Sequence, residues 1–157
     1  MTICKWISTT ENKKVDFDKR YGYQCVDLFR DYINKVLARE QPNGVKGAIN
    51  LWTDYQYNNN LKNIFNQTMK FHFGDWIIWE PTKSNPYGHI AMYINTQGSF
   101  FLVFEQDGYK QDGAKLIYRT RKGIAGGLSV RKVLPHITLR RSQATKDELL
   151  TTFSIAD

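Results

Sequence analysis

The chain has 157 residues, which is enough for one domain with a buried core. Hydrophobic residues make up 41% and aromatic residues 14%, which excludes a disordered or collagen-like chain. The net charge of +7 suits a polyanionic partner, and a count of only two cysteines excludes a disulfide-dense scaffold. No apolar run is long enough to cross a membrane, and the polar start MTICKWISTTENKK lacks the core of a signal peptide.

The predicted helices lie in the first half of the chain. The first 23 residues are expected to form coil. A helix is then predicted from the spacing of its apolar residues, which recur on one face: Cys25, Leu28, Phe29, Tyr32, Ile33, Val36 and Leu37. The turn-forming sequence QPNG at 41–44 ends this helix, and a weaker helix is predicted over about 45–57.

After Lys70 the chain becomes rich in aromatic and β-branched residues separated by turns. Strands are predicted over 75–79, 89–94, 100–105 and 115–118 and near Val130, with a flexible loop over 123–127. Helices followed by strands predict an α+β fold, with N-terminal helices packed on a C-terminal antiparallel sheet. We expect one domain over 1–141 and a terminal helix or linker stub over 142–157.

Three residues suggest nucleophilic catalysis. Cys25 begins the predicted helix, where the positive end of the helix dipole favours the thiolate. His89 begins one strand and Glu105 ends the next, so the acid can orient the imidazole if the two strands are neighbours. Singly each residue is weak evidence, because a helix cysteine is often buried packing and a histidine at a strand edge is often structural.

Two segments, YGYQCVDLFRDYI and GDWIIWEPTKSNPYGHIAMYI, together with VFEQDGY, closely resemble the CHAP family of cysteine- and histidine-dependent amidohydrolases/peptidases. This family is common in phage endolysins and has a papain-like α+β fold. The resemblance covers about residues 15–133, with three motifs in the right order. It implies that Cys25 is the nucleophile, His89 the base and Glu105 the residue that orients the histidine.

Asp107 departs from the family pattern, which commonly has an asparagine at this position, two residues after the glutamate. An amide can donate a hydrogen bond, whereas an ionised carboxylate can only accept one. We therefore expect Asp107 to be an accessory residue of the catalytic group and not an essential one.

A run of acids precedes the nucleophile. Asp16, Asp18 and Asp27 occupy positions 1, 3 and 12 of a twelve-residue span, which is the spacing of an EF-hand-type calcium loop. The strict consensus is not met, because Arg20 stands at position 5 and Tyr21 at position 6.

Several CHAP endolysins carry a calcium loop directly before the catalytic cysteine. The resemblance implies calcium as a structural cofactor, with side-chain ligands from Asp16, Asp18 and Asp27 and carbonyl ligands from Arg20 and Gly22. The alternative is a solvated turn in which these acids pair with neighbouring lysines and arginines. Asp27 would also interact favourably with the helix dipole.

The resemblance thus implies a peptidoglycan hydrolase that acts as an amidase or an endopeptidase. The sequence does not choose between the two. The nine basic residues between 113 and 146, with no acid among them, are expected to form a solvated face or to attract anionic wall polymers. No nucleic-acid-binding motif is found. We expect a monomer that is made in the host cytoplasm and acts at the bacterial cell wall, or is virion-associated.

Two alternatives remain open at the level of sequence. One is a non-catalytic basic module that binds anionic wall polymer or nucleic acid. The other is a thiol-dependent amidase or peptidase that acts on a substrate other than peptidoglycan.

Overall fold

Short helical segments precede the sheet in the structure, a computed structural model that describes residues 1–20 and 24–132. The expected helix or linker over 142–157 lies outside these residues. Among the described residues, no helix is long and apolar enough to cross a membrane. The helical segments are α1 (Ile3–Thr10), α2 (Cys25–Tyr32), the π-helical turn η1 (Ile33–Leu37), α3 (Asn50–Thr53), the 3₁₀ turn η2 (Tyr55–Tyr57) and α4 (Asn59–Ile64).

One six-stranded antiparallel sheet forms the rest of the domain. Its strands are β1 (Phe65–Thr68), β2 (Trp76–Trp79), β3 (His89–Gln97), β4 (Phe100–Gln106), β5 (Ala114–Thr120) and β6 (Ile124–Val130). Their order across the sheet is β1-β6-β2-β3-β4-β5, so the sequential strands β2 to β5 are neighbours. The α+β prediction, with helices packed on an antiparallel sheet, is confirmed.

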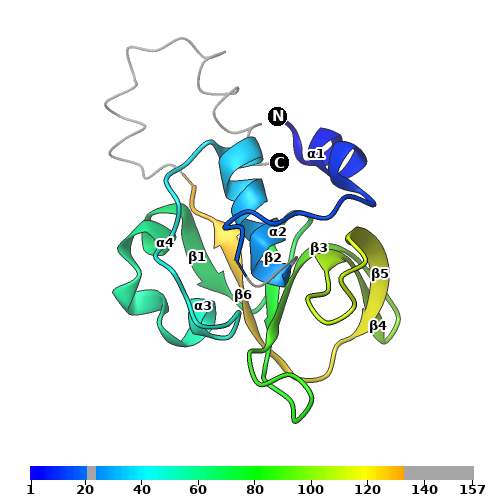
Figure 1. The fold of residues 1–157 in the computed structure, drawn as a ribbon. Helices are drawn as coiled ribbons and strands as arrows, with labels where there is room; N and C mark the ends of the chain where they lie inside the picture. Colours follow the sequence, from blue (N-terminus) through cyan, green and yellow to red (C-terminus); the bar gives the residue numbers. More distant parts are fainter. Residues whose placement is uncertain (21–23, 133–157) are drawn as a thin grey trace.

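Helix α2 packs on one face of the sheet, against β3 and β4, and the main core lies beneath it (Figure 1). Aromatic rings fill much of this core, with Trp6 from α1, Tyr32 from α2 and Trp76 from β2 in mutual contact. A smaller core lies on the other face of the sheet and contains Ile77, Trp79, Ala91, Phe101 and Val103. The sheet is therefore buried on both faces near β2 and β3, where His89 begins its strand.

The segment after α1 joins the edge of the sheet. The Asn12 amide donates to the Ala114 carbonyl (2.7 Å), and the Ala114 amide donates to the Lys13 carbonyl (2.9 Å). Gly113 has a φ of +89°, and a Cβ there would lie 2.9 Å from the Lys13 carbonyl oxygen. These contacts bring the N-terminal chain alongside the start of β5 and the end of β4.

Two local predictions are wrong. The first 23 residues are not all coil, because Thr2 caps α1 and Ile3 and Trp6 bury one side of this short helix. Residues 123–127 are not all loop, because β6 begins at Ile124. Glycine fits inside β6 because the Trp52 ring lies over Gly126 and the Phe71 ring over Gly127, where a Cβ would clash.

Candidate active site

Cys25 is the first residue of α2 and is partly buried. The helix begins here because Asp27, in its first turn, accepts a hydrogen bond from the Gln24 amide (3.0 Å). An acid in the first turn also interacts favourably with the helix dipole. The thiol is thereby fixed at the N-terminal end of the helix, as the sequence predicts.

His89 is fixed by the tight turn that precedes β3. Gly88 has a φ of +74°, and a Cβ there would lie 2.7 Å from the Trp79 carbonyl oxygen, so this position requires glycine. The Asn85 side chain donates to the Gly88 carbonyl (2.8 Å), and the Ile49 amide donates to the Tyr87 carbonyl (3.0 Å). The backbone that precedes His89 is therefore fixed by hydrogen bonds from the Asn85 side chain and the Ile49 amide.

The imidazole of His89 lies between the thiol and a carboxylate. Its Nε2 is 3.0 Å from Oε1 of Glu105, and the ring also hydrogen-bonds the Cys25 side chain. Burial alone would lower the pKa of His89, but the hydrogen bonds and charges of Cys25 and Glu105 outweigh it and raise this pKa to about 9. The imidazolium form is therefore favoured at neutral pH.

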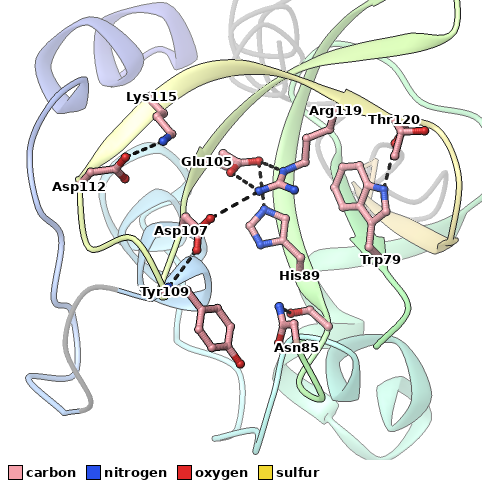
Figure 2. A network of polar contacts seen from close by, with 11 residues as sticks. Trp79, Asn85, His89, Glu105, Asp107, Tyr109, Asp112, Lys115, Arg119 and Thr120 are labelled. Carbon is pink, nitrogen blue, oxygen red and sulfur yellow. Dashed lines mark hydrogen bonds and ion pairs between the residues drawn. The ribbon is translucent and has the colours of Figure 1, made fainter. Parts of the chain in front are cut away.

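Glu105 is fully buried, with an exposed fraction of 0%, and is held by two cationic partners (Figure 2). Arg119 on β5 donates from Nη2 to Oε2 of Glu105 (2.6 Å) and from Nε to Oε1. Burial would raise the pKa of Glu105, but the bonds and charges of Arg119 and His89 lower it to about 2. The carboxylate therefore stays ionised and orients the imidazole.

Arg119 is the member of this group that sequence reasoning missed. In the sequence it is one of the nine basic residues of the 113–146 segment, and nothing in the composition separates it from the others. Strand pairing would not have found it either, because the sheet register places Lys115, and not Arg119, opposite Glu105.

Asp107 lies next to this group but does not contact His89. Its Oδ1 accepts a hydrogen bond from the Tyr109 amide (2.9 Å), and its Oδ2 is 3.9 Å from Nη2 of Arg119 (Figure 2). Its carboxylate thus stabilises the turn after β4 and adds a distant charge to Arg119. An accessory role for Asp107 remains a prediction.

A hollow of about 590 Å³ opens beside His89. Its walls include Trp79, Asn85, Asp107 and Arg119 together with the imidazole. The Trp79 ring is 5.8 Å from the His89 ring, and its indole N–H donates to the Thr120 carbonyl (3.2 Å). The imidazole therefore lies on a wall of this hollow that combines aromatic and charged surface.

The three predicted acids gather at the N-terminal end of α2. Carboxylate oxygens of Asp16, Asp18 and Asp27 lie within 4.8 Å of one another. The Arg20 amide donates to Oδ1 of Asp18 (2.9 Å), whereas the proposed ligand Gly22 lies outside the described residues.

Like charges gather in this acid cluster, and the charge of Arg30 interacts with two of its members, Asp18 and Asp27. Burial raises the pKa of Asp27 to about 6, and the charges of Asp18 and Asp16 add to the rise while backbone hydrogen bonds oppose it. Oδ1 of Asp16 is buried and has no hydrogen-bond partner. Hard carboxylate oxygens and an unsatisfied buried oxygen fit the ligand preference of calcium.

Comparison with known proteins shows a similarity in sequence and a similarity in fold. No family model matches the chain. Over 99 residues it is 31% identical to the endolysin PlyTW of Staphylococcus phage Twort (strain DSM 17442 / HER 48), a match that covers 57% of this chain and 19% of that protein. The chain thus spans about a fifth of the length of this curated relative.

Among solved structures, the fold is similar to that of Ly7917, with a TM-score of 0.61 and 16% identity over 83% of this chain and 62% of that one. The structure of Ly7917 with the hydrolyzing product of MDP gives the same TM-score at 15% identity, over 79% of this chain and 59% of that one. The chain therefore shares its fold with Ly7917 and part of its sequence with a phage endolysin.

Proposed function

We propose that the protein is a peptidoglycan hydrolase of the CHAP type, which cleaves an amide bond of the bacterial cell wall with Cys25 as nucleophile. The observation that carries this proposal is the continuous hydrogen-bonded series from Cys25 through His89 to Glu105, beside an open hollow. The partial sequence similarity to a phage endolysin supports peptidoglycan as the substrate.

The proposed reaction is acyl transfer in two steps. The Cys25 thiolate attacks the amide carbonyl carbon, and collapse of the tetrahedral intermediate breaks the C–N bond while the His89 imidazolium gives its proton to the leaving amine. Water then attacks the thioester and gives a proton to His89, and the C–S bond breaks to release the acid. The backbone N–H of Cys25, at the first position of α2, would stabilise the oxyanion.

The acid cluster is proposed as a calcium site. Asp16, Asp18 and Asp27 would hold the ion, with carbonyls of Arg20 and Gly22 as further ligands. A bound ion would compensate the clustered negative charge and stabilise the segment ahead of Cys25. No bond-breaking step uses it.

The first test is loss of turbidity of purified cell walls. Wild type, Cys25→Ala and Cys4→Ala would be compared, since Cys4 is the exposed cysteine of the chain and serves as a matched control. We expect lysis by wild type and Cys4→Ala and none by Cys25→Ala. Equal lysis by Cys25→Ala would overturn the cysteine mechanism, and no lysis by wild type across walls of several bacteria would overturn the substrate.

The same digests identify the bond. Mass spectrometry of the released fragments would show free glycan and intact peptide after amidase action, or shortened peptides after endopeptidase action. Repeating the assay with calcium and with EDTA tests the metal site, since lysis that is indifferent to EDTA would contradict it.

A further inference from the structure

Gln106 is a fully buried polar residue, with an exposed fraction of 0%, that the proposed reaction does not use. Its Oε1 accepts a hydrogen bond from the Val15 amide (2.7 Å). Its Nε2 donates to the Val15 carbonyl (2.7 Å) and to the Gln24 carbonyl (2.9 Å). Both donor hydrogens of the side-chain amide are therefore used, and the partners are 91 and 82 residues away in the sequence.

The position of Gln106 on β4 explains why it reaches these partners. Successive side chains of a strand point to opposite faces of the sheet. Glu105 points to His89 and Arg119, so Gln106 points the other way, toward the chain that leads into α2. Of these two consecutive buried residues, Glu105 thus contacts His89, and Gln106 contacts the residue that precedes Cys25.

We propose that Gln106 is a positioning residue that holds Cys25 opposite His89. Gln24 directly precedes Cys25, so an anchor on its carbonyl fixes the backbone that carries the thiol. The same side-chain amide also binds the backbone of Val15. The two ends of the segment between Val15 and Gln24 are therefore both bound to Gln106. This inference rests on the Cys25–His89 pair of the proposed function.

The chemistry of the amide makes the proposal testable. In Gln106→Glu the ionised side chain keeps an acceptor for the Val15 amide but places an oxygen against two carbonyls, which it repels. Gln106→Met has a similar size, makes none of the three bonds and adds no charge. Gln67→Glu is the matched control, because Gln67 is exposed and its amide donates to a single carbonyl, that of Trp52 (3.1 Å).

The experiment measures the alkylation rate of Cys25 by iodoacetamide from pH 5 to pH 9. All variants would carry Cys4→Ser, so that only Cys25 reacts. We expect Gln106→Glu and Gln106→Met to lose at least about tenfold in rate at pH 6–7 and to change the pH dependence of that rate, because the thiol is no longer held against the His89 imidazole. Gln67→Glu should keep the wild-type rate and profile.

Circular dichroism and the unfolding temperature separate this effect from loss of the fold. Folded Gln106 variants with wild-type rate and profile would overturn the proposal, and so would loss of the fold in both variants, which indicates a general structural role. If only Gln106→Glu fails to fold, Gln106→Met decides by the same measurements. Because alkylation needs no wall substrate, failure of the wild type to lyse walls would overturn the proposed function and leave this test intact.

Discussion

Two groups, each with one buried carboxylate, lie next to the Cys25–His89 pair and have opposite electrostatic properties. Glu105 is completely buried, yet its partners Arg119 and His89 hold its pKa near 2 against the effect of burial. Asp27 is almost as buried, and burial together with the charges of Asp18 and Asp16 raises its pKa to about 6. Burial acts in the same direction in both groups, so the partners decide the outcome.

The difference shows which carboxylate obtains its compensating charges from the chain itself. Glu105 has two cations within hydrogen-bond distance and needs nothing further. The acid cluster has three carboxylates and an unsatisfied oxygen on Asp16; backbone amides donate to Asp18 and Asp27, and the charge of Arg30 interacts with the same two residues. We therefore expect variants of the first group to lose function or stability in any buffer, and variants of the second to differ from wild type mainly when calcium is present.

The largest effect is expected from Glu105→Gln. The amide keeps the shape but removes the charge that orients and stabilises the imidazolium, so the rate of wall lysis should fall on the order of 10²- to 10⁴-fold. Glu40→Gln, at an exposed position, should lyse walls at the wild-type rate. Initial rates of turbidity loss provide the measurement, and a Glu105→Gln rate within twofold of wild type would remove Glu105 from the mechanism.

Arg119→Ala should have the next largest effect. It removes one partner of a buried ion pair, so the free energy of unfolding should fall by about 3 kcal/mol. Arg121→Ala is the control, since the Arg121 guanidinium lies over the Phe101 ring (4.9 Å) near the surface, a contact worth about 1 kcal/mol at most. Urea unfolding of both variants tests this, and equal losses would contradict the assigned difference.

Asp16→Asn tests the proposed calcium site in the acid cluster. Calcium at about 100 times its dissociation constant should stabilise the wild type by about 2.7 kcal/mol, with a corresponding rise in unfolding temperature, and should stabilise the variant much less. In EDTA the variant should be at least as stable as wild type, because it removes one of three like charges. Asp112→Asn, at an exposed acid paired with Lys115, should respond to calcium as wild type does; an equal response of Asp16→Asn would exclude this ligand.

The last prediction is a pH dependence of stability. The folded-state pKa of His89, about 9, lies above its ordinary value of 6.5, so its contribution is complete below pH 6.5 and is lost as the pH rises through 9. The slope for one proton is at most about 1.4 kcal/mol per pH unit. The difference in unfolding free energy between wild type and His89→Gln should shrink over this interval, and no change would contradict the shift. His72→Gln, at an exposed histidine, is the control.

Local patterns were enough to predict α2 and most of the sheet. The apolar face that begins at Cys25 has helical spacing, and the strands from Trp76 onward are bounded by turn residues. β1 and the helix α4 were not predicted, because short polar segments such as 58–60 carry little periodic signal. Their structure depends on contacts with β6 and η2, which are distant or irregular in the sequence.

The sequence predicted only those residues of the candidate site whose side chains have distinctive chemistry. A cysteine, a histidine and acids at fixed spacings stand out, and the structure brings Cys25, His89 and Glu105 together as it does the three acids. Their roles stay predictions. Arg119 and Gln106 were missed because an arginine in a basic segment and a glutamine in a strand become distinctive only when the fold brings distant partners to them.

The contact between the Trp79 and His89 rings gives the site an optical reporter. A protonated imidazole beside an indole quenches its fluorescence, so the emission of Trp79, 5.8 Å from His89, should brighten as the imidazole loses its proton. The other three tryptophans, Trp6, Trp52 and Trp76, provide a background that substitution to phenylalanine can reduce. The proton that the proposed reaction transfers could then be followed by fluorescence during turnover, without any added label.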